Sequence, residues 1–153
     1  MQAHALSKVA PDRVAAAFAE LKALLGPRAT TAQAVRDHHA KDESWHVPVA
    51  PDAVVFPHST EEVAEVVRIC VRHEVPMVPF GTGTSLEGHV IPVRGGVTID
   101  LTQMNQVVRV SAEDLDVTVQ PGVTRKQLNE HLRATGLFFP IDPGADASIG
   151  GMT

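Results

Sequence analysis

Cysteine is almost absent from this chain of 153 residues, because Cys70 is the only one. One cysteine cannot form an internal disulfide, which suits a reducing compartment. Long hydrophobic runs are absent too, since Asp, Glu, Arg or Pro interrupts each apolar stretch before it could cross a bilayer. Residues 1–30 contain no signal-peptide core, and Asp12 and Glu20 are unusual in a mitochondrial presequence. We therefore expect a protein of bacterial-type cytoplasm without a transmembrane segment.

Positive charge is scarce as well. The chain has 13 Lys and Arg residues against 18 Asp and Glu residues, a formal net charge of -5. A nucleic-acid-binding domain needs a basic surface, so this balance argues against nucleic acid as a principal partner. The remaining composition, 44% hydrophobic and 20% charged, is ordinary for a globular protein with a core.

Lysine is missing from the most informative stretch, PFGTGTSLEG at residues 79–88. Gly81 and Gly83 can adopt positive φ and turn successive N–H groups toward one side, which forms an anion-binding nest. Without a lysine the stretch is not a P-loop. It is also a poor Rossmann fingerprint, because Leu86 occupies the third glycine position and Pro92 interrupts the helix that should follow.

A second glycine-rich stretch lies at residues 142–151, close to the end of the sequence. Two such loops in one chain indicate an extended ligand that is held in several places, so a dinucleotide is favoured over a lone phosphate. The alternative left open by these residues is a pair of glycine-rich connections without a ligand.

Hydrophobic periodicity predicts a β-α-β unit around the first loop. Residues 11–25 read as a helix that stops at Gly26 and Pro27, and residues 31–50 as a short helix with an irregular segment. Residues 54–56 and 77–80 read as strands, so the first loop leaves the carboxyl end of the second strand, where ligands bind in α/β sheets. Between them, residues 59–73 predict a helix with a Ser59 and Glu62 capping box. Its predicted buried stripe is Val63, Val66, Val67, Cys70 and Val71.

The period changes after the first loop. Short strands are predicted at residues 97–101, 106–111 and 116–120. A helix follows over residues 124–135, with a Thr124 and Gln127 capping box at its start and Gly136 at its end. The sequence stops just beyond the second loop without a closing element, so we expect it to be part of a longer polypeptide.

Three motifs occur in a characteristic order: PFGTGTSLEG at residues 79–88, PGVTRK at residues 121–126 and FPIDPGADASIGGM at residues 139–152. With them, the sequence from residue 51 to residue 153 resembles the FAD-binding half of flavoprotein oxidoreductases related to vanillyl-alcohol oxidase and para-cresol methylhydroxylase. Within this group it is most similar to the branch of D-lactate dehydrogenase (cytochrome) and the glycolate oxidase flavin subunit.

The resemblance implies an α+β FAD-binding domain of the para-cresol methylhydroxylase type, with two small β-sheets and flanking helices, incomplete at its C-terminus. Residues 1–50 would be an N-terminal helical extension, and residues 51–153 the first part of the FAD-binding domain. The substrate-holding cap domain would follow. The implied FAD-binding residues are Pro79, Gly81, Thr82, Gly83, Thr84, Ser85, Gly88, Pro121, Gly122, Pro143, Gly144, Ala145, Asp146, Ser148, Ile149, Gly150 and Gly151. Thr84 stands where some relatives attach FAD through a histidine, so the resemblance implies non-covalent FAD.

The implied reaction is oxidation of a small D-2-hydroxy acid, of the D-lactate or glycolate type, to the 2-oxo acid. In such a reaction a base removes the hydroxyl proton while the α-hydrogen passes to the flavin as hydride, and an unknown acceptor such as a cytochrome or quinone takes the electrons. That acceptor could hold the protein at a membrane surface. The family's catalytic residues lie later in the chain, so no catalytic residue is assigned here, and residues 1–153 alone should be inactive. The alternatives are a 2-hydroxyglutarate dehydrogenase, another FAD enzyme of the group such as an alkyl-ether-lipid synthase, or a non-catalytic nucleotide-binding fragment.

Several polar residues admit two interpretations. The spacing of His38, His39 and His46 matches no strong zinc pattern, so we expect solvent or loop histidines and no metal. His89 beside the first loop is expected to support that loop rather than to act in catalysis. Asp146 suits either a ribose hydroxyl or the amides of its own loop. Cys70 is expected to lie inert on a helix core face.

Overall fold

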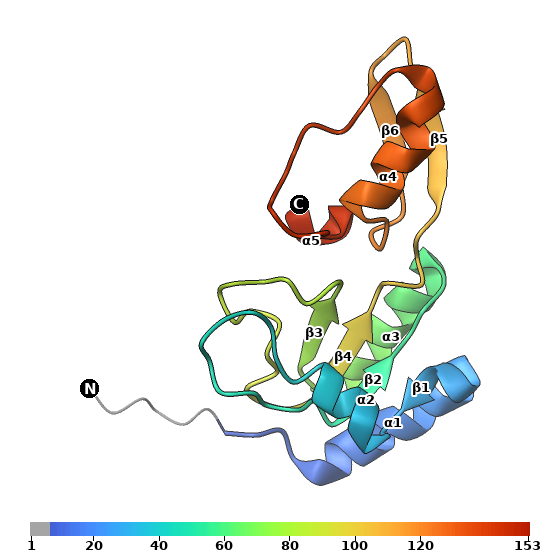
Figure 1. Cartoon of the computed structure of the whole chain (residues 1–153). Helices are drawn as coiled ribbons and strands as arrows, with labels where there is room; N and C mark the ends of the chain where they lie inside the picture. The colour runs from blue at the N-terminus through green and yellow to red at the C-terminus, as the bar shows by residue number, and fades with distance from the viewer. Residues whose placement is uncertain (1–6) are drawn as a thin grey trace.

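The computed structural model describes residues 7–153, which form two lobes (Figure 1). The first lobe, residues 7–101, contains a four-stranded sheet in the order β1-β2-β4-β3. Strands β2, β4 and β3 are parallel, and β1 pairs antiparallel with β2. The strands are β1 (Ala29–Thr30), β2 (Ala53–Val55), β3 (Met77–Phe80) and β4 (Val97–Asp100).

Helices α1 (Pro11–Leu25) and α3 (Thr60–Arg72) pack against one face of this sheet. The chain leaves α1 through Gly26, at φ 58°, and a short 3-10 turn, as the glycine and proline there predict. The core between helices and sheet consists of Ala17, Leu21, Leu25, Ala29, Ala53, Val55, Val66, Ile69, Cys70, Val75, Val97 and Ile99. The β-α-β unit that the sequence predicts is confirmed, with β4 placed between its two strands.

The opposite face of the sheet is buried as well, which parallel strands require. Val54 and Thr98 alternate with the core residues and are fully buried. The short helix α2 (Gln33–His38) and the irregular segment after it lie between β1 and β2 in the sequence, as predicted. Residues 1–50 thus contribute α1 and β1 to the same core as β2 and β4. The domain boundary at residue 50 stays a prediction.

The second lobe, residues 107–153, pairs a β-hairpin with a helix. Strands β5 (Val107–Ser111) and β6 (Asp116–Val119) are antiparallel, and α4 (Arg125–Leu132) packs on them through Leu128 and Leu132. The Thr124 and Gln127 capping box is confirmed, with both of its hydrogen bonds formed. A 3-10 turn, Arg133–Thr135, follows and ends at Gly136 in the left-handed conformation. The last element is α5 (Ile149–Met152). The predicted α+β class with two small sheets is confirmed.

The predicted stripe of α3 is wrong in part. Val66 and Cys70 are buried, but Val67 and Val71 are exposed, and Ile69 takes their place in the core. The helix therefore faces the core at a slightly different rotation from the predicted one. None of the helices formed by residues 7–153 is long and apolar enough to cross a membrane.

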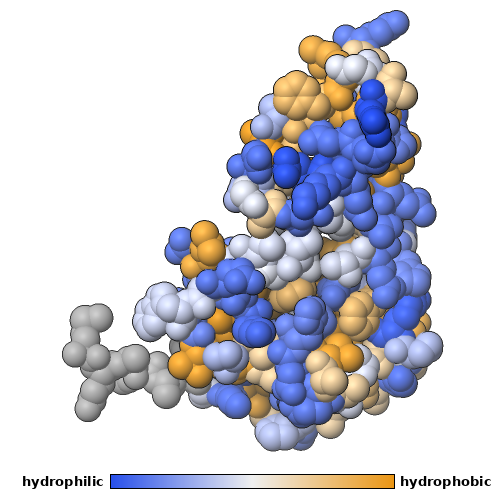
Figure 2. Space-filling model, in the orientation of Figure 1, coloured by the Kyte–Doolittle hydropathy of each residue, from blue (hydrophilic) through white to orange (hydrophobic). Residues whose placement is uncertain are grey.

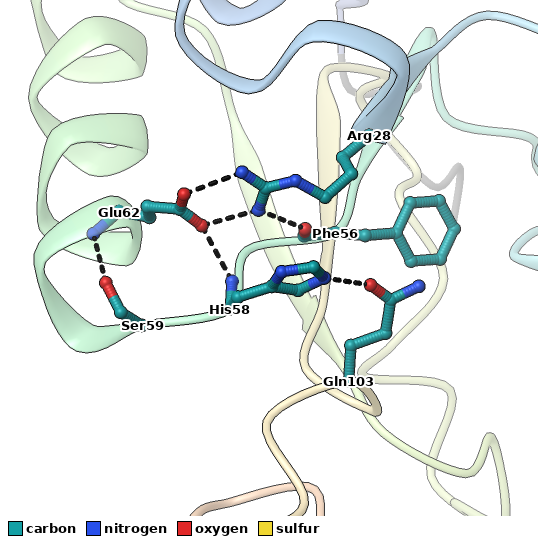
Figure 3. A network of polar contacts seen from close by, with 6 residues as sticks. All are labelled: Arg28, Phe56, His58, Ser59, Glu62 and Gln103. Carbon is teal, nitrogen blue, oxygen red and sulfur yellow. Dashed lines mark hydrogen bonds and ion pairs between the residues drawn. The ribbon is translucent and has the colours of Figure 1, made fainter.

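The start of α3 differs from the predicted capping box. Ser59 accepts a hydrogen bond from the Glu62 N–H at 3.2 Å, but the Glu62 carboxylate does not return to Ser59. Instead it accepts two hydrogen bonds from Arg28 at 2.6 Å each and one from the His58 N–H at 2.7 Å (Figure 3). Arg28 also donates to the Phe56 carbonyl at 3.1 Å. These bonds join the 3-10 turn before β1, the segment after β2 and the start of α3 at one point.

The Arg28 hydrogen bonds hold the pKa of Glu62 at about 2, well below its ordinary 4.5. Because the pKa of Glu62 is lower in the folded than in the unfolded state, its ionised carboxylate stabilises the fold at pH values above the unfolded-state pKa. This contribution is lost as the pH falls from 4.5 toward 2. Glu62→Gln should therefore lower the free energy of unfolding by about 1–2 kcal/mol at pH 7. In urea titrations the difference from wild type should shrink below pH 4. Glu65→Gln, which breaks an exposed pair with Arg68, should change stability by less than about 0.5 kcal/mol. Equal effects of the two substitutions would contradict this role of Glu62.

Candidate functional site

The first glycine loop, residues 81–88, leaves the carboxyl end of β3. Gly83 has φ 70° and Gly88 has φ 74°, so a side chain at either position would be strained. Gly81 has no positive φ, but a Cβ there would lie 2.5 Å from the Ser148 Oγ and would require that hydroxyl to rotate away. A Cβ at Gly83 would lie 2.9 Å from the Phe80 ring. The glycines therefore serve two purposes, conformation and close approach.

The backbone amides of this loop are available to a ligand. Among residues 7–153, no protein acceptor is found for the N–H groups of Thr82, Gly83, Thr84 and Ser85. The Thr82 and Thr84 hydroxyls lie 3.2 Å apart. Thr82 is exposed and the other three residues are half-buried, so these four successive N–H groups are free to donate to an anion or to water.

The segment of residues 42–46 holds the far end of the loop. The Asp42 carboxylate accepts hydrogen bonds from the Gly88 N–H and the Ser44 N–H, each at 3.0 Å. The Glu43 N–H donates to the Ser85 carbonyl at 3.0 Å. Although partial burial acts to raise it, hydrogen bonds from Ser44, Ser85 and Gly88 lower the pKa of Asp42. The carboxylate is thus an ionised anchor for the loop.

The second glycine loop, residues 142–151, is fixed to the start of α4. The Ile149 N–H donates to the Val123 carbonyl at 2.7 Å, and the Arg125 N–H donates to the Ala147 carbonyl at 3.0 Å. The Asp146 carboxylate accepts from the Lys126 N–H at 3.0 Å. Asp146 thus contacts the first turn of α4 and not the amides of its own loop. A contact of Asp146 with a ribose hydroxyl stays a prediction.

Two adjoining cavities lie where the two loops meet, one of about 190 Å³ and one of about 180 Å³. Both are lined by Gly81, His89, Val90, Ser148 and Gly151. Ser148 is only 2% exposed, and no hydrogen bond of its hydroxyl to the described residues is found. The hydroxyl is therefore free to bind a ligand or water in the cavities that Ser148 lines.

The structure brings most of the predicted site residues to these cavities. Those that line them are Pro79, Gly81, Thr82, Gly83, Thr84, Ser85, Pro121, Pro143, Ser148, Gly150 and Gly151. The others lie behind the walls. Gly88 packs against His46, Gly122 against the Leu101 carbonyl, and Ile149 in the core of the second lobe. Gly144, Ala145 and Asp146 line neither cavity.

Sequence reasoning missed several wall residues. Val90, Ala147, Met152, Phe80 and Leu101 line the cavities with apolar atoms. No local signal distinguishes them from ordinary packing residues. Only membership in a motif could have marked some of them, since Phe80 lies inside the first motif and Ala147 and Met152 lie inside the third. His89 accompanies the loop as expected, with its Nδ1 3.1 Å from the Ser85 hydroxyl.

The histidines before β2 correct one expectation. His38 and His46 are exposed, but His39 is 2% exposed and lies in the interior beside Asp100. It lies in the turn that follows α2, as a loop histidine would, but it does not face solvent. No group of three metal-binding side chains occurs in the part of the chain that the structure describes. Cys70 is buried in the core as expected, and burial raises the pKa of its thiol to about 11.

A larger cavity, of about 450 Å³, lies in the second lobe between β6 and the segment of residues 136–140. Its walls are mainly apolar, and Leu115 and Phe138 are largely exposed beside it. Hydrophobic side chains reach the surface at several places on this lobe (Figure 2). Such a cavity lacks the successive backbone donors that a phosphate needs, so the site is placed at the glycine loops.

Curated relatives extend well beyond this sequence. The chain is 52% identical over 143 residues to the probable mitochondrial D-lactate dehydrogenase of Danio rerio, covering 94% of this chain and 28% of that one. It is 47% identical to the mitochondrial D-lactate dehydrogenase (cytochrome) of Arabidopsis thaliana, and the match covers 88% of this chain and 24% of that one. It is 41% identical to glycolate oxidase subunit GlcD of Bacillus subtilis, covering 66% and 22%. The chain thus spans about a quarter of the length of these relatives.

Solved structures share the fold. An alkyldihydroxyacetonephosphate synthase superposes with a TM-score of 0.81 at 28% identity, covering 99% of this chain and 30% of that one. A p-cresol methylhydroxylase with bound substrate superposes with a TM-score of 0.75 at 29% identity, covering 84% and 26%. A sequence profile of the FAD binding domain matches residues 51–153, and these residues include both glycine loops. The chain therefore belongs to the FAD binding domain family, in the form found in flavoproteins of the p-cresol methylhydroxylase type.

Proposed function

We propose that the two glycine loops hold the pyrophosphate of FAD. The observation that supports this most directly is the group of four unpaired amides, Thr82 to Ser85, which shares its cavity with the unpaired hydroxyl of Ser148. Gly81 and Gly83 leave the backbone uncovered on that side. The remaining predicted contacts, Pro79, Pro121, Pro143, Gly150 and Gly151, would complete the walls.

The residues present fit a pyrophosphate held without a cation. No Lys or Arg lines either cavity, so oriented N–H dipoles and hydroxyls would meet the negative charge. Pockets for whole ligands of moderate size measure about 300–1,000 Å³. Each cavity here is smaller, which suits the central part of a dinucleotide whose two ends extend to other segments.

We infer that the whole protein oxidises a small D-2-hydroxy acid of the D-lactate or glycolate type. This inference is supported by the names of its most similar curated relatives. FAD, when bound, supplies the hydride-accepting chemistry. The residues described here bind and orient it; the base and the substrate-carboxylate site belong to the part of the relatives that this chain does not span.

A second candidate is a D-2-hydroxyglutarate dehydrogenase, because a protein of that name from Stutzerimonas stutzeri is 34% identical over 135 residues. The electron acceptor is proposed to be a cytochrome, a quinone or another redox partner. For the compartment we propose the cytoplasm, with contact to a membrane only through that acceptor. Mitochondria are the competing location, since the Danio and Arabidopsis relatives carry that word in their names.

Gly83→Val should abolish FAD binding. A β-branched residue at φ 70° is strained by about 1–3 kcal/mol, and its side chain would displace the Phe80 ring beneath the loop. The measurement is the flavin content of the purified full-length protein and titration of its apoprotein with FAD. Gly136→Val is the matched control, because Gly136 has φ 73° with open space around it, far from the loop in sequence. Flavin content at the wild-type level in Gly83→Val would place the cofactor elsewhere.

FAD should be bound without a covalent link. Thr84, which corresponds to the position at which some relatives of the resembled family attach FAD through a histidine, cannot form that bond, and its hydroxyl lies beside Thr82. Precipitation of the full-length holoprotein with acid should release all yellow flavin into the supernatant. Flavin that stays with the denatured pellet would show a covalent link at another residue.

The holoprotein should reduce an artificial electron acceptor with D-lactate or glycolate as substrate. With L-lactate, kcat/KM should be at least about tenfold lower, because two groups on its α-carbon are wrongly placed and this costs about 1.4 kcal/mol or more. Steady-state assays with D-lactate, glycolate, L-lactate and D-2-hydroxyglutarate make the comparison. A clear preference for D-2-hydroxyglutarate would favour the second candidate. No turnover of any of the four by flavin-loaded protein would contradict both.

A further inference from the structure

His39 is buried directly behind the first glycine loop. It follows the last residue of α2 and is 2% exposed, and its partner Asp100, the last residue of β4, is 5% exposed. The His39 Nε2 lies 2.8 Å from an Asp100 carboxylate oxygen, and the His39 Nδ1 lies 2.8 Å from the Val35 carbonyl. The proposed cofactor site uses neither side chain.

Both ring nitrogens face oxygen acceptors, and this determines where the protons lie. A carbonyl can only accept, so the Nδ1 carries a proton and donates it to Val35. A second proton lies in the bond between the Nε2 and Asp100, whichever of the two atoms holds it. The other Asp100 oxygen accepts from the Thr102 N–H at 2.8 Å. Hydrogen bonds at both ends therefore fix the plane of the ring.

The fixed ring contacts the loop through one residue. The centroid of the His39 ring lies 4.5 Å from that of Phe80, and Asp100 is the register partner of Phe80 across β3 and β4. The Phe80 ring in turn forms the floor under Gly83, since a Cβ there would come within 2.9 Å of it. His39, Phe80 and Gly83 thus follow one another from the interior toward the proposed pyrophosphate cavity.

Stability alone does not account for a polar pair at this place. Buried ion pairs contribute little net stability compared with apolar side chains of similar volume. The surroundings of His39 include Phe56 and Phe80, which would pack well against an apolar residue. What an apolar residue cannot do is hold one ring orientation through two directional bonds.

We propose that His39 and Asp100 form a positioning pair that fixes Phe80 and, through it, the backbone amides of the first glycine loop for phosphate binding. This rests on the proposed pyrophosphate site. The pair itself touches neither the cofactor nor the substrate.

The test compares FAD affinity with fold stability in full-length apoprotein. His39→Phe combined with Asp100→Asn removes both directional bonds without leaving a buried charge unpaired. Val66→Ala is the matched control, because Val66 is fully buried on the other face of the same lobe and belongs to a core cluster that excludes Phe80. The double variant should bind FAD about tenfold more weakly, as measured by calorimetric titration. The control should lower the melting temperature but keep FAD affinity within about twofold of wild type.

A second variant keeps the test possible if the double variant does not fold. His39→Gln can keep the bond to Asp100 but loses the ring that lies against Phe80, so it too should weaken FAD binding by several-fold. Wild-type affinity in either variant, or equal loss in Val66→Ala, would overturn the positioning role. Nitrogen NMR of His39 in the wild-type holoprotein should show a protonated Nδ1; an unprotonated Nδ1 would also overturn it. If Gly83→Val keeps its flavin, the proposed pyrophosphate site is wrong. If Gly83→Val loses its flavin while both His39 variants bind FAD like the wild type, that site stands and only the positioning role is wrong.

Discussion

The contact between Gly81 and Ser148 is the constraint on which the site depends. The two residues come from different lobes, and they approach so closely that a Cβ on Gly81 would lie 2.5 Å from the Ser148 hydroxyl. The two cavities share both residues as walls. A side chain at position 81 would therefore force the Ser148 hydroxyl to rotate away from the place where the two lobes meet. Gly81 has no positive φ, so the feature that sets it apart is this close approach and not its backbone angles.

The lobes reach this contact through short backbone links. The Leu101 N–H continues the sheet to the Phe80 carbonyl at 3.0 Å, and the Gly122 N–H bonds the Met104 carbonyl at 2.8 Å. The Gly150 N–H then bonds the Pro121 carbonyl at 2.9 Å, with no space for a side chain at Gly150. Predicted site residues that line neither cavity, such as Gly122, belong to this set of links. Their role is to set the distance between the loops.

The first loop is also supported from the segment between β1 and β2. Asp42 accepts a hydrogen bond from Gly88 at one end of the loop, and His39 lies against Phe80 at the other end. The loop itself therefore needs few internal bonds, and its central amides stay free. An acidic protein of net charge -5 can in this way offer a local anion site without a basic side chain.

The sequence by itself determined the local features: the bounds of α1, the capping box of α4, the strand before the first loop, and the family, from three ordered motifs. These follow from periodicity, caps and glycines, which act over a few residues. Tertiary structure decided what depends on distant partners. The Glu62 carboxylate binds Arg28 and not Ser59, and Ile69 is buried where Val67 was predicted to be. His39 lies in the interior because Asp100, 61 positions later, pairs with it. Asp146 likewise found the start of α4 across 20 residues. A side chain with a choice of partners takes the one that the assembled backbone brings nearest, and no local pattern carries that information.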